Sequence, residues 1–157
     1  MNEQPIRVDM LKQYPAIDEA AADRLLAEEI AKSRVKLAVL DDDPTGVQTV
    51  HDISVYTEWG IDAMRSAFAE DNKVFYILTN SRGMTPEETT RVHKEIVAAA
   101  AEVSKETGIP YFFMSRSDSP LRGHYPLEPE LLKEGMEQNG TPVDGEILCY
   151  FFRRSEE

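Results

Sequence analysis

The sequence predicts an α/β domain with a Rossmann-like three-layer fold and a mainly parallel sheet of about four to five strands. Two observations lead to this fold class. Short apolar runs alternate along the chain with longer stretches of helical periodicity. Several of these runs also stop abruptly at polar residues, as strands do when a parallel sheet buries both of their faces. The helices between such strands form right-handed crossovers that cover the sheet.

The first half of the chain is expected to form two helices and two strands. Apolar residues at helical spacing predict a helix over residues 15–33. The apolar run 36–40 predicts a buried strand, because three aspartates stop it. Residues 52–57 are expected to form a further strand, and residues 61–70 a short helix.

The best-marked helix lies in the second half of the chain. Thr85 precedes Pro86, and Glu88 follows three positions after Thr85, which is the pattern of a capping box with proline at the first helical position. Apolar residues then recur along one face until Gly108, a residue that commonly ends helices.

The remaining elements of the second half follow from shorter signals. Residues 74–78 and 109–114 are apolar runs that predict strands, and residues 128–137 predict a helix. The run 146–149 predicts the start of a last strand, in which Cys149 would be a small core residue. The chain therefore divides into a helical lead-in over residues 1–34 and an α/β domain over residues 35–157.

The composition argues against several classes of partner. The 29 acidic residues outnumber the 17 basic ones and give a net charge of −12, which disfavours binding to nucleic acid. Apolar runs such as Ile96–Ala101 are too short to span a bilayer, so no membrane association is expected. The N-terminus shows no secretory signal, and a single cysteine cannot form an internal disulfide. These features predict a cytoplasmic protein.

Three predicted strands deliver polar loops to the same edge of the sheet. Ligands of open parallel sheets bind beyond the carboxyl ends of the strands, so these loops are expected to form one cleft. Carboxylates there can accept hydrogen bonds from hydroxyls, and guanidinium groups can hold an anion. Such a cleft suits a small polyhydroxylated acid. The side chains expected to share it are those of Asp42, Asp43, Arg82, Asp118, Arg122 and His124.

Each cluster also has a purely structural interpretation. The three aspartates could cap the next element, with Pro44 and Gly46 serving a turn. Arg82 could form a surface ion pair, and Asp118 could pair only with Arg122. The other two histidines, His51 and His93, are interpreted as surface or helix residues rather than as catalytic ones.

The acidic loop also fits the D-x-D-x-T pattern of phosphatases of the haloacid dehalogenase type. In that interpretation Asp41 attacks phosphorus, Asp43 handles the proton, and magnesium lies beside them. Thr79 would then belong to a phosphate-binding loop. A later pair of aspartates that would complete such a metal site is missing from the sequence.

Taken together, the three loops resemble the signature of the four-carbon acid sugar kinases, over about residues 36–148. The matching segments are Asp42-Asp43-Pro44-Thr45-Gly46, Thr79-Asn80-Ser81-Arg82 and Asp118-Ser119-Pro120-Leu121-Arg122-Gly123-His124. The resemblance implies an N-terminal domain that holds threonate, erythronate or 3-oxo-tetronate, and a separate C-terminal domain that binds ATP.

The resemblance also implies roles for individual residues. It implies that Asp42 or Asp43 lies near the substrate hydroxyls as the catalytic carboxylate, that Arg82 and Arg122 lie near the substrate carboxylate, and that Asp118 orients the sugar. Phosphorylation of a hydroxyl needs such a carboxylate to position it and accept its proton. The remaining substrate-binding residues that it implies are Thr45, Gly46, Asn80, Ser81, Ser117, Ser119, Gly123 and His124.

Three departures from the family pattern shape the functional expectation. Pro120 stands where the family usually has threonine, the tail 150–157 ends where the family chain continues, and no phosphate-cradling glycine motif occurs. We therefore expect the substrate half of a kinase, truncated before its ATP-binding domain and inactive alone. ATP and Mg²⁺ are implied for the parent family, and no metal is expected on this chain. Homodimerisation through uncovered apolar surface is a further expectation, and a non-enzymatic remnant that binds small acids is the remaining alternative.

Overall fold

The computed structural model describes residues 15, 18–45, 47, 50–117 and 123–149. Contacts between residues divide the chain into two units, Met1–Ser33 and Arg34–Glu157, which are described separately. None of the helices in the described ranges is long and apolar enough to cross a membrane.

The first unit contains helix α1, Glu19–Lys32, within the range that the periodicity predicts. The Asp18 carboxylate caps it by accepting a hydrogen bond of 2.9 Å from the backbone N–H of Ala21. At the other end Lys32 donates to Glu29 at 2.8 Å. The helix buries none of its residues.

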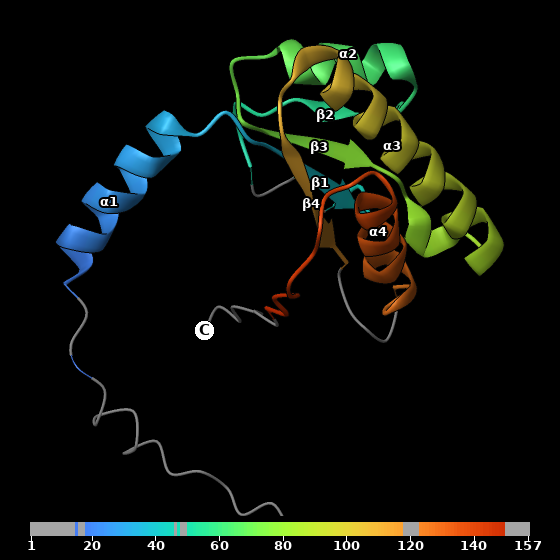
Figure 1. Ribbon diagram of the computed structural model, residues 1–157. Coiled ribbons are helices and arrows are strands. Elements are labelled where there is room, and N and C mark those ends of the chain that lie inside the picture. The colour runs from blue at the N-terminus through green and yellow to red at the C-terminus, as the bar shows by residue number, and fades with distance from the viewer. Residues whose placement is uncertain (1–14, 16–17, 46, 48–49, 118–122, 150–157) are drawn as a thin grey trace, which may run out of the picture. The chain divides into compact units, whose positions relative to one another are not determined.

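The second unit is built on a four-stranded sheet in the order β2-β3-β1-β4, with every neighbouring pair parallel (Figure 1). The predicted α/β class is therefore confirmed, and the arrangement is consistent with a Rossmann-like three-layer domain. The strands are β1 (Lys36–Asp41), β2 (Val55–Tyr56), β3 (Val74–Leu78) and β4 (Tyr111–Arg116). The helices are α2 (Ile61–Ala69), α3 (Pro86–Thr107) and α4 (Leu127–Gln138), with a short 3₁₀ turn, η3, at Ser81–Gly83.

Helix α3 has the ends that the sequence predicts. Thr85 Oγ1 accepts a hydrogen bond of 3.3 Å from the Glu88 N–H, and the Glu88 carboxylate accepts one of 2.9 Å from the Thr85 N–H. Gly108 ends the helix with a φ of +66°, in the left-handed region that glycine adopts without strain. The capping box and the glycine stop are both confirmed.

Alternate residues of the strands form the core with the helices. Ala38 and Leu40 of β1 lie beside Phe75 and Ile77 of β3, and all four are at most 2% exposed. The helices complete this cluster through Met64, Ala67, Phe68, Val92, Ile96, Val97, Ala100, Val103 and Leu132. The helices pack against this face of the central strands, and this packing fixes the positions of the carboxyl ends of the strands.

The strand predicted over residues 146–149 is wrong. Residues 141–149 form no strand, Ile147 is 95% exposed, and Cys149 is exposed rather than in the core. An apolar run this short carries too little periodicity to separate a strand from a loop. The strand predicted over 52–57 is reduced to Val55–Tyr56, and the one predicted over 109–114 begins at Tyr111 and continues to Arg116.

Candidate functional site

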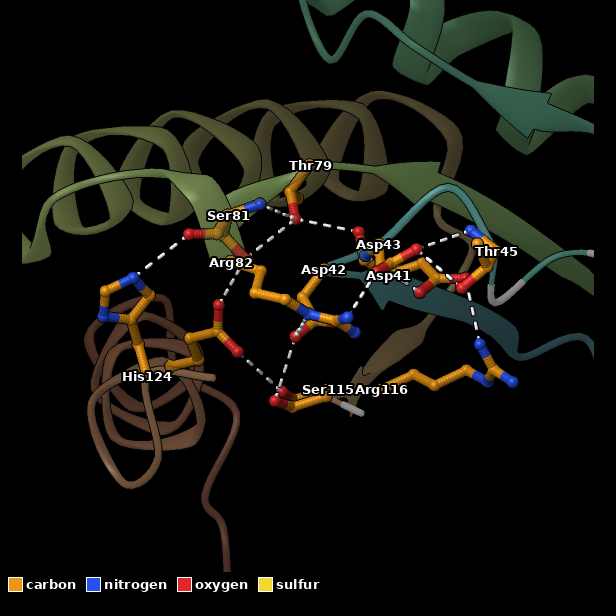
Figure 2. Close-up of polar contacts among 12 residues, drawn as sticks. Asp41, Asp42, Asp43, Thr45, Thr79, Ser81, Arg82, Ser115, Arg116 and His124 are labelled. Carbon is orange, nitrogen blue, oxygen red and sulfur yellow. Dashed lines mark hydrogen bonds and ion pairs between the residues drawn. The ribbon is translucent and has the colours of Figure 1, made fainter. Parts of the chain in front are cut away.

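Three strand ends meet at one edge of the sheet because β1 lies between β3 and β4. Asp41, the last residue of β1, is in register with Leu78 on one side and Arg116 on the other. The loops that follow these residues therefore begin side by side, and Figure 2 shows their polar side chains in contact. The predicted convergence of these loops is present in the described residues.

Asp41 holds the strand ends together. Its side chain is 1% exposed and accepts a hydrogen bond of 3.1 Å from Arg116 Nη1. Its backbone carbonyl accepts two bonds of 2.9 Å from Thr79, one from the N–H and one from Oγ1. Burial raises the pKa of the Asp41 carboxyl, while the N–H of Asp43 and the Arg116 guanidinium act in the opposite direction. Asp41 is thus enclosed within the site.

Asp42 joins all three loops. Its side chain is 3% exposed and is bound by Arg82, with Nη2 3.2 Å from Oδ1 and Nε 3.4 Å from Oδ2. Ser117 Oγ donates to the same Oδ2 at 3.2 Å. The backbone N–H of Asp42 donates to the carbonyl of Arg116, and the backbone carbonyl of Asp42 accepts from the N–H of Arg82, both at 3.4 Å. Asp42 therefore fixes the spacing of the loops after β3 and β4.

The end of the third loop passes close to this carboxylate at Gly123. A Cβ atom at Gly123 would lie 1.9 Å from Ser117 Oγ and 3.3 Å from Asp42 Oδ2. The first distance is far below any normal contact, so a larger residue would displace the Ser117 hydroxyl from Asp42. Glycine is needed at this position for the close approach.

The partly exposed charges of the site are Asp43, Arg82 and Arg116. Their side chains are 20%, 21% and 34% exposed. Asp43 forms an ion pair with Arg82 Nη1, and its other oxygen accepts hydrogen bonds from the N–H of Thr45 at 2.7 Å and from Thr45 Oγ1 at 2.6 Å. Among the described residues, two guanidinium groups and one carboxylate thus line the accessible part of the site.

A buried layer supports the turn that carries Arg82. Ser81 is fully buried, and its Oγ donates to Glu128 Oε1 at 2.5 Å. His124 Nε2 lies 3.1 Å from the carbonyl of Ser81 and 3.0 Å from that of Met84. Since both neighbours are acceptors, Nε2 carries a hydrogen and donates to them. Figure 2 shows the imidazole of His124 directed toward Ser81.

Most of the described residues predicted for the site do lie together. Asn80 is exposed beside them, with a φ of +56° that allows the sharp turn after β3. Gly46, Asp118, Ser119 and Arg122 lie outside the described residues. The predicted residues that the structure brings together are Asp42, Asp43, Thr45, Ser81, Arg82, Ser117, Gly123 and His124.

Four residues that hold the site are absent from the set of site residues expected from the sequence, although Thr79 lies in one of the matching segments. Arg116 is in register with Asp41, and Thr79 bonds the Asp41 carbonyl. Glu128 and His93 are buried beneath Ser81. The sequence does contain a signal for Glu128 and His93, because each of them lies on the apolar face of its helix. Glu128 lies three and four positions before Leu131 and Leu132, where a charged side chain needs a buried partner.

The described polar side chains of the site include guanidinium groups, carboxylates and hydroxyls. Within the described ranges, no group of three or more His, Cys, Asp or Glu side chains is arranged to hold a metal ion. The sequence contains no glycine-rich phosphate loop either. The arrangement of the two described guanidinium groups beside carboxylates and hydroxyls is suited to binding an anionic polyol by hydrogen bonds.

Comparison with known proteins gives one match. A family model described as a sugar-binding N-terminal domain matches residues 37–155, a range that contains all three loops and the whole sheet except Lys36, the first residue of β1. No curated protein and no solved structure matches the chain.

Proposed function

The chain belongs to the sugar-binding N-terminal domain family, the N-terminal domains of four-carbon acid sugar kinases, and on that premise we propose that it binds a four-carbon sugar acid as the phosphoryl acceptor. Threonate, erythronate and 3-oxo-tetronate are the candidate ligands. The observation that carries the proposal is the arrangement of Arg82 and Arg116 beside Asp43 at the joined ends of β3, β1 and β4.

The anion-binding part of the proposed site consists of guanidinium groups. Arg82 is held by Asp42 and Asp43, and Arg116 by Asp41, so both cations are fixed in position before a ligand arrives. Both remain partly exposed, at 21% and 34%. A guanidinium held in this way can bind a carboxylate with little further loss of side-chain entropy. Arg122, which the family resemblance adds to this group, lies outside the described residues.

The hydroxyl-binding part is assigned to Asp43 rather than to Asp42. Both oxygens of each carboxylate have protein partners, but Asp42 is only 3% exposed whereas Asp43 is 20% exposed. A carboxylate that contacts the ligand can accept a hydroxyl hydrogen bond and, during phosphoryl transfer, the hydroxyl proton. Asp42 then acts by holding Arg82 and the third loop.

In this proposal ATP and Mg²⁺ belong to the parent kinase and are not bound by the residues described above. The parent reaction would transfer a phosphoryl group from ATP to a hydroxyl of the bound acid. The part of that work assigned to this chain is to bind the acid, orient its hydroxyl and receive the proton. We expect the chain alone to turn over no ATP.

The geometry disfavours the phosphatase interpretation of the acidic loop. That chemistry requires Asp41 to attack phosphorus, so its carboxylate must be reachable from solvent. The Asp41 side chain is 1% exposed and is bound by Arg116 and by the N–H of Asp43. An attacking oxygen enclosed in this way has no approach to a phosphate ester.

A thermal-shift panel tests the proposal. Threonate, erythronate and 3-oxo-tetronate are compared with butanoate, which keeps the carboxylate and lacks the hydroxyls. A ligand present at about 100 times its Kd stabilises the folded chain by about 2.7 kcal/mol, which for a domain of this size raises Tm by several degrees. We expect this shift with at least one hydroxy acid and none with butanoate. Equal responses to all the acids, or no response to any, would exclude a sugar-acid site.

A second assay distinguishes the proposed function from the phosphatase interpretation. Release of inorganic phosphate from sugar phosphates is measured with magnesium, for the original chain and for Asp41→Asn. The proposal predicts no release above background from either protein. Magnesium-dependent release that Asp41→Asn abolishes would favour the phosphatase instead.

A further inference from the structure

Glu128 is a charged residue buried away from the partly exposed charges of the site. It lies in the first turn of α4, and its side chain is 3% exposed. Its Oε1 accepts the 2.5 Å hydrogen bond from Ser81 Oγ, and its Oε2 lies 3.4 Å from Ser115 Oγ. The two oxygens of one carboxylate are therefore bonded to two different segments of the sheet edge.

Those two segments carry the groups that hold Asp42. Ser81 directly precedes Arg82, which binds Asp42 from the β3 side. Ser115 lies two residues before Ser117, which binds Asp42 from the β4 side. A shift of Glu128 would therefore change the positions of Arg82 and Ser117 together, through the hydrogen bonds that Glu128 makes to Ser81 and Ser115.

The third neighbour of Glu128 is the imidazole of His93 on α3. His93 Nδ1 donates to the carbonyl of Thr89 at 2.9 Å, so Nε2 is the nitrogen that faces Glu128, 3.7 Å from Oε1. Both side chains are almost fully buried, at 1% and 3% exposed. A carboxylate is costly to bury unless its oxygens are bonded, and here each oxygen has a hydroxyl donor. An apolar residue would pack at this position without that cost, so the charge points to a role beyond packing.

We propose that Glu128 is the positioning residue of the ligand site, and that it acts through Ser81 and Ser115 to set the separation of Arg82 and Ser117. The proposal deepens the sugar-acid function and rests on it for its effect on affinity. The proposal requires that one carboxylate couples the loops that follow β3 and β4, and this coupling can be measured without any ligand.

Hydrogen exchange provides the ligand-free test. Two amides report on contact between the loops, the N–H of Asp42 bonded to Arg116 and the N–H of Arg82 bonded to Asp42. In Glu128→Ala we expect both amides to exchange about tenfold faster or more, while those of Val39 and Ile77 inside the sheet stay within about threefold of the original chain. Glu128→Gln keeps an oxygen that can accept from Ser81, and should restore slow exchange at Arg82.

Leu132→Ala is the matched control on the same helix. Leu132 is 5% exposed in the core, so its truncation destabilises α4 without touching the carboxylate. Faster exchange at Asp42 and Arg82 in Glu128→Ala but not in Leu132→Ala supports a positioning role. Equal behaviour of the two variants, or loosening of one loop alone, overturns it. If Glu128→Ala does not fold, Ser81→Ala removes the donor instead and must give the same faster exchange at Arg82.

Calorimetric titration with the sugar acids separates the two proposals. If the original chain binds an acid, Glu128→Ala should weaken binding about tenfold or more at a temperature well below its Tm, and Glu128→Gln by no more than about threefold. Unchanged affinity in folded Glu128→Ala overturns the positioning role while leaving the sugar-acid site intact. If the original chain binds no acid, the sugar-acid function fails, and the exchange result alone decides whether Glu128 couples the loops.

Discussion

Replacement of Gly123 by alanine is the sharpest test of how the third loop meets the acidic loop. The new Cβ would lie 1.9 Å from Ser117 Oγ, so the serine hydroxyl must rotate away and lose its 3.2 Å hydrogen bond to Asp42. A hydrogen bond to a charged acceptor contributes about 1.5–3 kcal/mol. Replacing glycine with alanine also reduces the entropy of the unfolded chain, which offsets about 0.4–1 kcal/mol. We therefore expect Gly123→Ala to lower the free energy of unfolding by about 1–2 kcal/mol.

Urea denaturation at neutral pH measures this change, and Gly83 supplies the control. A Cβ at Gly83 would meet nothing within 4 Å, although the residue lies in the turn that follows β3 at the same site. Gly83→Ala should therefore be neutral or stabilising by up to about 1 kcal/mol. Equal effects of the two substitutions would refute the close approach at Gly123.

A double-mutant cycle isolates the cause. Ser117→Ala removes the hydroxyl that the new methyl group would displace, leaving a contact of 3.2 Å with the Cβ of residue 117. In that background Gly123→Ala should cost no more than about 0.5 kcal/mol. If Gly123→Ala costs the same with and without the serine hydroxyl, the loss is not that of the Ser117–Asp42 bond.

Three further predictions follow from other contacts. Thr85→Ala removes the cap of α3 and should lower the free energy of unfolding by about 1 kcal/mol in thermal denaturation, whereas Thr90→Ala in the same helix should be close to neutral. Burial lowers the pKa of His93 from its usual 6.5, so the unfolded chain takes up a proton that the folded chain resists. Stability should therefore fall as the pH drops below 6.5, by up to about 1.4 kcal/mol per pH unit, and His93→Gln should flatten this dependence. Arg116→Met leaves the Asp41 carboxylate buried without its cation and should lower the free energy of unfolding by about 1–3 kcal/mol in urea denaturation. This loss is smaller than for a fully buried pair because Arg116 is 34% exposed. Adding Asp41→Asn should recover part of the lost stability.

The elements that could be predicted from the sequence are those with local signals. Helix α3 carries its own start and stop, in the Thr85 capping box and in Gly108, so its bounds agree with the prediction. Strand β3 is a run of large apolar residues bounded by polar ones, and its predicted bounds are correct. The apolar residues 147–149 also follow polar ones, yet residues 141–149 form no strand, so a short apolar run alone does not distinguish a strand from a loop.

The site could be predicted only as a set of loops at one edge. Which charges pair across those loops depends on register and packing, which local sequence does not reveal. The resemblance leaves Asp42 and Asp43 as alternatives for the carboxylate near the ligand hydroxyls, and only the structure shows that Arg82 and Ser117 enclose Asp42 while Asp43 is more exposed. Glu128 has the appearance of an ordinary acid in the first turn of a helix until its contact with Ser81 is known.

The most direct test of the central claim is a titration of the ¹⁵N-labelled chain with threonate, erythronate and 3-oxo-tetronate, followed by two-dimensional NMR. The account predicts that at least one of these acids shifts the backbone amide signals of Asp43, Arg82 and Ser117 in a saturable manner, and that butanoate does not. Perturbations confined to another surface, such as the groove between α3 and α4 around Val97 and Gly135, would contradict it, as would the absence of any saturable shift with all three acids.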